Sequence, residues 1–262
     1  MSSMSRVLAL DTATDACTLA LCGEGDVRAR HEQLARAHNR HILGMLADIL
    51  ADRSLASAVD VIACGVGPGS FTGLRVAVSV AQGLAWARDI PVHGFCSLSA
   101  QVYSAAALGL ISEGQWVLST IDAQIGQLYG IWGQWREDHF HAEEAAFICP
   151  PESLTLPSEP ASVAIIGSGL AHAERFPQKL QHLSTVYPNI TPDAAVMAQR
   201  LSTGSLALAL QPAHSLSPQY VQQNIGWKKL SEQGSHGWLA AGRHCSADSR
   251  RDSVLAGRPL GA

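Results

Sequence analysis

The chain has 262 residues, of which 47% are hydrophobic and 15% are charged. This balance excludes a disordered chain and predicts a compact protein with either one large domain or two small ones. The formal net charge of −4 argues against a broad basic face that grips nucleic-acid phosphates.

The cysteines and the N-terminal residues bear on the compartment in which the protein works. The six cysteines include no Cys-x-x-Cys pair, and buried free thiols are the ordinary outcome in a reducing cytoplasm. Residues 1–6 contain no apolar segment of signal-peptide length, and no apolar run is long enough to span a membrane. We therefore expect a cytoplasmic protein that does not associate with membranes.

Hydrophobic periodicity predicts a mixed order of strands and helices in the first half of the chain. The expected strands cover residues 6–11, 17–22, 27–33, 59–64 and 91–95. The expected helices cover residues 39–51, 71–88 and 97–107. Ser97 is expected to cap the last of these helices.

The second half repeats this pattern in a shorter form. Strands are expected over 116–121, 127–132 and 163–166, and Thr191-Pro192-Asp193 is expected to open a helix that ends at Gly204, with the proline at the first helical position. Asp11 and Asp122 each end the first strand of a half, and they lie 111 residues apart. This repetition suggests an ancient duplication.

The order of three strands, helix, strand and helix, followed by a shorter copy, is the topology of the actin/Hsp70/sugar-kinase superfamily. We therefore predict an α/β protein with a duplicated, RNase H-like fold and two subdomains, residues 5–108 and 109–234. Residues 235–262 contain four arginines and two aspartates without periodicity, and we expect this tail to be disordered.

The glycine-rich segment Gly65-Val66-Gly67-Pro68-Gly69-Ser70-Phe71-Thr72-Gly73 joins a predicted strand to a predicted helix. Such loops often bind phosphate through their backbone N–H groups. The known patterns fail, because no lysine follows the last glycine, Ser70 replaces the third glycine of a dinucleotide loop, and Pro68 replaces the first glycine of a nucleophile elbow. The segment is therefore predicted to be a tight turn that permits close approach of another backbone.

This segment, extended through Leu74-Arg75, resembles the signature of the TsaB (YeaZ) family. Further similarities, in the same order along residues 5 to about 230, are Leu10-Asp11-Thr12-Ala13-Thr14, Ala81-Gln82-Gly83-Leu84-Ala85, Ile121-Asp122-Ala123, Pro218-Gln219-Tyr220-Val221 and Trp227-Lys228-Lys229-Leu230. The chain departs from many relatives at Val66, where they carry arginine. A basic side chain is therefore not expected to act at that point of the loop.

The resemblance implies a role in placing threonylcarbamoyl on adenosine 37 of tRNA. It implies a non-catalytic scaffold that binds the TsaD transferase through helices 39–51 and 71–87, or forms a homodimer when alone. A TsaE ATPase subunit would join the assembly, and tRNA would be reached through the complex.

The residues expected at the partner interface share these two helices. They are His38, His41, Ile42, Met45, Ile49, Phe71, Leu74, Arg75, Val78 and Gln82, with Val78 on the outward face. The residues expected to position the second helix are Gly65, Gly67, Gly69, Ser70 and Gly73.

Asp11 and Asp122 support an alternative function, because an active member of the superfamily would use such a pair around Mg²⁺ and ATP in phosphotransfer. Against this, active members usually have glycine directly after the first aspartate, where this chain has Thr12-Ala13-Thr14. We favour a vestigial nucleotide site in which Asp11 hydrogen-bonds the neighbouring turn.

A weaker alternative is a metallopeptidase. His38 and His41 lie three residues apart, which is tolerable geometry for two metal ligands on a helix. The catalytic relative TsaD is known for a His-x-x-x-His metal pair, and this chain is one residue short of that spacing, with no third ligand evident. We expect these histidines to lie at an interface, and we expect neither metal nor cofactor.

Overall fold

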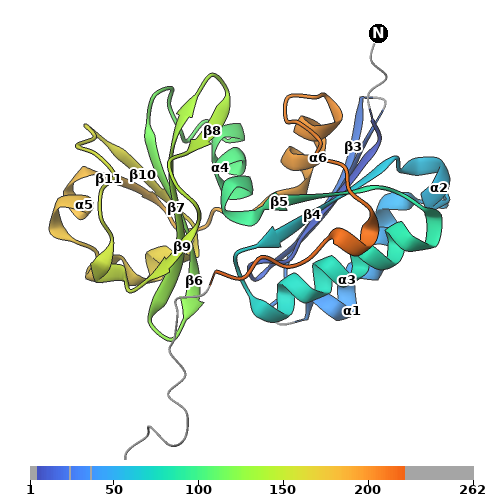
Figure 1. Ribbon diagram of the computed structural model, residues 1–262, viewed down its shortest axis with the longest axis horizontal. Helices are drawn as coiled ribbons and strands as arrows, with labels where there is room; N and C mark the ends of the chain where they lie inside the picture. The colour runs from blue at the N-terminus through green and yellow to red at the C-terminus, as the bar shows by residue number, and fades with distance from the viewer. Residues whose placement is uncertain (1–4, 24, 36, 222–262) are drawn as a thin grey trace, which may run out of the picture. The chain divides into compact units, whose positions relative to one another are not determined.

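The structure is a computed structural model that describes residues 5–23, 25–35 and 37–221 (Figure 1). These residues belong to one compact unit. The predicted tail, 235–262, and the Trp227-Lys228-Lys229-Leu230 motif lie outside the described residues, and the boundary between subdomains at 108 and 109 stays a prediction. No helix in the described ranges is both long and apolar enough to cross a bilayer.

The first sheet has five strands in the order β3-β2-β1-β4-β5. Their bounds are Val7–Asp11 (β1), Ala16–Gly23 (β2), Asp26–Gln33 (β3), Val61–Gly67 (β4) and Val92–Cys96 (β5). β1 pairs antiparallel with β2 and parallel with β4. β1 and β4 are buried at every position, which explains their unbroken apolar sequence, since helices cover both faces of the sheet.

Four helices accompany this sheet. They are α1 (His38–Leu50), α2 (Leu55–Ala58), α3 (Phe71–Arg88) and α4 (Ser97–Ala107). Helices α1 and α3 contact each other and lie side by side on one face of the sheet (Figure 1). Ser70 caps α3, since its side chain accepts a hydrogen bond from the Gly73 N–H.

The second sheet repeats the first, with the path β11-β10-β6-β7-β8 and with β9 paired to β7. Its strands are Trp116–Gln124 (β6), Gln127–Arg136 (β7), His139–Ala142 (β8), Phe147–Cys149 (β9), Val163–Ile166 (β10) and Ser184–Tyr187 (β11). As in the first sheet, the β6–β7 and β7–β8 pairs are antiparallel while β6–β10 and β10–β11 are parallel. The expected duplicated actin-like fold is confirmed.

The helical segments of the second half are shorter. They are η1 (Pro151–Ser153), η2 (Ser168–Arg175), α5 (Gln178–Leu183), α6 (Ala194–Ser202) and η3 (Ala213–Ser215). Helix α6 contacts β1 and β2 of the first sheet, where the Ala194 N–H donates to Thr18 Oγ1 at 3.0 Å. One apolar core, including Val7, Tyr103 and Met197, joins residues of both halves.

Two of the predicted helix starts are wrong. Cys96 occupies the cap position of α4, because the Ser97 hydroxyl donates to Asp11 Oδ2 at 2.6 Å instead of capping the helix. In α6 the capping residue is Asp193, whose carboxylate accepts from the Ala195 N–H. Pro192 therefore precedes the cap rather than occupying the first helical position.

The interface expected on α1 and α3 needs a larger correction. Five of its proposed residues are buried in the core of this chain: Ile42, Met45, Ile49, Leu74 and Val78. Val78 is only 4% exposed, so its placement on the outward face is wrong. Helix α3 packs against β1 and β4, and that packing requires the stripe that contains Val78. The outward stripe holds Thr72, Arg75, Ser79 and Gly83, which are exposed.

Val78→Glu is expected to unfold the protein rather than split an assembly. The variant would bury an unpaired carboxylate among apolar side chains, at a cost of more than about 3 kcal/mol. Ser79→Glu is the matched control, because Ser79 is exposed on the same helix and its variant should unfold within about 0.5 kcal/mol of the wild type. Urea denaturation followed by circular dichroism measures both, and equal stability of the two variants would contradict the placement of Val78.

Candidate functional site

The centre of the site is a contact between two backbone segments, the β1–β2 turn and the glycine loop. The Ser70 N–H donates to the Ala13 carbonyl at 2.7 Å, and Thr12 Oγ1 donates to the Gly73 carbonyl at 2.7 Å. A β-carbon on Gly69 would lie 2.4 Å from the Ala13 oxygen, and one on Gly73 would lie 1.9 Å from the Thr12 oxygen. The glycines are therefore required by the closeness of the two backbones.

The beginning of the loop has two further constraints. A β-carbon on Gly65 would lie 1.8 Å from Asp11 Oδ2. Gly67 has a φ of +108°, which disfavours any residue with a side chain, and the β4–β5 register shifts between Gly65 and Gly67. The predicted tight turn with close backbone approach is thus present, and it leads directly into α3.

Asp11 is sealed beneath this contact. It is 1% exposed, and its carboxylate accepts hydrogen bonds from Ser97 Oγ at 2.6 Å and from the Ala13 N–H at 2.7 Å. Burial raises the pKa of Asp11 to about 6, although both hydrogen bonds act to lower it. The interpretation that Asp11 hydrogen-bonds the neighbouring turn is confirmed.

Asp122 is the counterpart of Asp11 in the second half, with the same local turn. Its Oδ1 accepts from the Gln124 N–H at 2.8 Å and lies 3.1 Å from His172 Nε2, while its own N–H donates to Ser168 Oγ at 3.0 Å. Unlike Asp11, its side chain is 30% exposed. The two aspartates therefore occupy equivalent places in the repeat but different environments.

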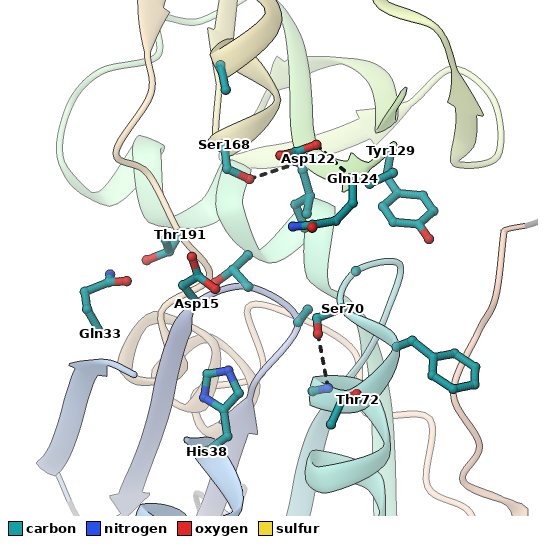
Figure 2. A pocket seen from close by; sticks show the side chains of 18 of the residues that line it. Asp15, Gln33, His38, Ser70, Thr72, Asp122, Gln124, Tyr129, Ser168 and Thr191 are labelled. Atoms are coloured by element: carbon teal, nitrogen blue, oxygen red, sulfur yellow. Dashed lines mark hydrogen bonds between the residues drawn. The ribbon is translucent and has the colours of Figure 1, made fainter. Parts of the chain in front are cut away.

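A cleft of about 1000 Å³ lies beside the glycine loop and is lined by both halves of the chain. Figure 2 shows Asp15 and His38 on one side and Asp122, Tyr129 and Ser168 on the other. Asp11 is not among the lining residues. The structure therefore does not bring Asp11 and Asp122 together in this cavity as the pair required for Mg²⁺ and ATP.

A second, smaller cavity of about 410 Å³ lies between α1 and α3; we call it the helix groove. Its lining residues are Asn39, Ile42, Leu43, Phe71, Thr72, Arg75, Val76, Ser79 and Val80. Large apolar side chains are exposed on these helices, with Leu43 58%, Phe71 55% and Trp86 75% exposed. A β-carbon added at Gly44 or Gly83 would touch nothing within 4 Å, so packing within the chain does not explain these glycines.

Residues 216–221 contact α3 beside the helix groove. Gln82 Nε2 donates to the Leu216 carbonyl at 2.8 Å. The Arg75 guanidinium lies 3.7 Å from the centre of the Phe71 ring, and its Nε donates to the Tyr220 hydroxyl at 3.1 Å. The Pro218-Gln219-Tyr220-Val221 similarity therefore corresponds to a segment that supports three of the residues predicted at the interface.

The two histidines predicted at the start of α1 have different environments, since His38 is buried and lines the cleft while His41 is exposed. Sequence reasoning missed Leu43 and Trp86 as surface residues. Leu43 follows Ile42 directly, so it falls outside the apolar stripe of α1. An apolar residue outside such a stripe is the signal that could have identified it.

Comparison with known proteins places the chain among proteins of tRNA modification. A profile of the family described as "TsaD: tRNA N6-adenosine threonylcarbamoyltransferase" matches residues 31–173. Two curated relatives share the description "tRNA threonylcarbamoyladenosine biosynthesis protein TsaB". The one from Haemophilus influenzae is 32% identical over 86% of this chain and 96% of its own length, and the one from Escherichia coli is 30% identical over 86% and 98%. The solved structure "YeaZ from Pseudomonas aeruginosa" matches with a TM-score of 0.72 at 31% identity, over 83% of this chain and 100% of that one.

Gly69→Ala should destabilise the protein, because its β-carbon would overlap the Ala13 carbonyl. The expected loss is about 1–3 kcal/mol of unfolding free energy. Gly83→Ala is the matched control, since its β-carbon meets open space within a helix and should add about 0.5–1 kcal/mol. Chemical denaturation of both variants tests the contact, and a neutral Gly69→Ala would show that the two backbones can separate without cost.

Asp11→Asn should change how stability depends on pH. The carboxyl pKa rises from 3.8 in its ordinary state to about 6 in the folded protein, so the folded state binds its proton more tightly than the unfolded state does. Its contribution to stability is therefore present below about pH 4 and is lost as the pH rises through 6. At pH 8 the buried charge costs on the order of 3 kcal/mol.

Asparagine carries no charge and can keep both neighbouring hydrogen bonds. The variant should thus gain stability relative to wild type between pH 4 and pH 8, as measured by urea denaturation at several pH values. A difference between the two proteins that stays constant over this range would show that Asp11 does not titrate there.

Proposed function

Because the chain belongs to the TsaB (YeaZ) family of tRNA threonylcarbamoyladenosine biosynthesis proteins, we propose that it acts there as a non-catalytic subunit that binds and organises a TsaD-like transferase. The observation that carries this proposal is the exposed helix groove between α1 and α3. Leu43, Phe71 and Trp86 expose large apolar surfaces on these two helices, and a concentration of such residues marks interaction sites.

The chemistry of the groove suits another pair of helices. Ser79, Gly44 and Gly83 present small exposed side chains or none, which allows a facing helix to approach closely. The chain itself matches a TsaD family profile over residues 31–173, so a TsaD-like partner would share its fold and would offer an equivalent helix pair. Two pairs of this kind can form a four-helix bundle.

The same groove would serve in a homodimer when the partner is absent, because an interface between two copies uses the same surface on both. In the assembly that we propose, a TsaE-like ATPase subunit joins the TsaD-like subunit, and tRNA is bound through the complex. We place this assembly in the cytoplasm.

The proposal that this subunit does not catalyse phosphotransfer rests on the loop contact. The N–H groups of Ser70, Ala13 and Gly73, which could bind phosphate, are donated instead to groups of the protein. Asp11 is buried under the same contact. No arginine or lysine occurs among the described residues that line the cleft. Each of these features disfavours ATP with Mg²⁺ in this cavity.

Leu43→Glu should abolish docking without unfolding the chain. Leu43 is 58% exposed, so the free subunit should keep its circular dichroism spectrum and its midpoint of urea denaturation. A charge within the apolar interface should weaken binding to the TsaD-like subunit of the same organism by about a hundredfold or more. Calorimetric titration measures the affinity, and a reconstituted reaction measures threonylcarbamoylation of tRNA, which should fall in parallel.

Leu108→Glu is the matched control, because Leu108 is 66% exposed and lies at the end of α4, outside the helix groove. It should bind the partner and support tRNA modification as the wild type does. Normal binding by Leu43→Glu, or equal losses in both variants, would remove the helix groove from the proposal.

A further inference from the structure

The cleft beside the glycine loop has an unusual balance of charge. Its lining contains two carboxylates, Asp15 and Asp122, and no arginine or lysine among the described residues. Asp15 is exposed, and no partner of its carboxylate occurs in the described part of the chain. The cavity is therefore poorly suited to an anion and well suited to a group that carries positive charge.

His38 adds a second and independent observation. It is 6% exposed, it lines the cleft, and its Nδ1 is a buried atom without a hydrogen-bond partner. Burial lowers the pKa of His38 more than its hydrogen bond to the Thr14 backbone and the nearby Asp15 raise it. The imidazole is thus neutral near pH 7.

The tautomer of His38 follows from these contacts. A backbone hydrogen bond that raises the pKa of an imidazole is one in which the ring donates to a carbonyl oxygen. Because Nδ1 is unpartnered, the bond to Thr14 must use Nε2, and the single proton of the neutral ring lies there. Nδ1 then presents a lone pair, and a buried lone pair without a partner is costly unless a ligand donates to it.

The three groups together form a set of hydrogen-bond acceptors on two sides of one cavity. Figure 2 shows Asp15 and His38 on the side of the first half, with Asp122 facing them from the second half. The neighbouring N–H groups of Ala13 and Gln124 are occupied by Asp11 and Asp122, respectively, so the acceptors are not balanced by these donors. An acceptor set with net negative charge selects a ligand with several N–H donors.

We infer that the cleft binds a cationic group, a guanidinium or an ammonium, through Asp15, His38 and Asp122. The Tyr129 ring, which also lines the cavity, supplies an aromatic face of the kind that attracts such cations. The same chemistry can come from two sources, a small organic cation that enters the cleft or a basic side chain of a protein docked at its rim. This inference goes beyond the docking proposed for the helix groove and does not depend on it.

The test compares two probes of the same shape in calorimetric titrations of the full chain. N-acetylarginine amide carries a guanidinium, and N-acetylcitrulline amide carries a neutral urea in its place. The arginine compound should bind at least about fivefold more tightly, and its affinity should fall as salt concentration rises. Equal affinities for the two probes, or tighter binding of ATP with Mg²⁺ than of the arginine compound, would overturn the inference.

Variants locate the binding. Asp15→Asn and Asp122→Asn should each weaken binding of N-acetylarginine amide at least about fivefold, since each removes one charge while keeping a side chain of similar shape. Asp89→Asn is the matched control, because Asp89 is exposed at the end of α3 and does not line the cleft; its affinity should equal that of the wild type. Wild-type affinity in both cleft variants, with circular dichroism unchanged, would place the cation elsewhere and overturn the inference.

Titration of the complex with the TsaD-like subunit separates the two sources. If a basic side chain of the partner occupies the cleft, the complex should not bind N-acetylarginine amide, and both cleft variants should weaken the complex. If the cleft takes a free cation, the complex should bind the probe as the free chain does. The Leu43→Glu variant keeps the two proposals apart, since it should lose the partner and still bind the probe.

Discussion

The organisation of this protein depends on the close approach of two backbone segments, the turn after β1 and the glycine loop after β4. Their carbonyl and N–H groups bond directly to one another, and no β-carbon can fit at Gly69 or Gly73 without displacing the turn. The contact fixes the first residues of α3, since Ser70 both donates to the turn and caps the helix. It also closes the space in which a loop of this kind would otherwise hold phosphate.

The duplicated fold shows what this contact changes, because the second half has no such loop against its first strand turn. Asp11 and Asp122 make the same hydrogen bond to the residue two positions ahead. Asp11 is buried and its pKa is raised to about 6, whereas the Asp122 side chain is 30% exposed and faces the cleft. One repeat has thus converted its aspartate into a structural group, while the other has kept its carboxylate accessible.

Most of the fold was predictable from periodicity, because long strands such as β1 and β4 and amphipathic helices such as α1 have strong patterns. The outward face of α3 was not. That helix has apolar residues on several sides, with Val78 in the core and Val76 and Val80 only partly buried, so its pattern does not identify the buried face. The role of Ser97 was also hidden, since its hydrogen bond to Asp11 joins residues 86 positions apart. Short strands such as β9, with three residues, carry too little pattern to be predicted.

The two cavities share part of their walls. Asn39, Phe71, Thr72 and Val76 line both the cleft and the helix groove, and three of these residues belong to the first turns of α3, whose start the glycine loop fixes. A partner in the groove and a cation in the cleft would therefore touch the same short segment. By thermodynamic linkage, any effect of one ligand on the affinity of the other must be reciprocal. The glycine loop thus links the two binding surfaces, because it holds rigidly the one helix start that they have in common.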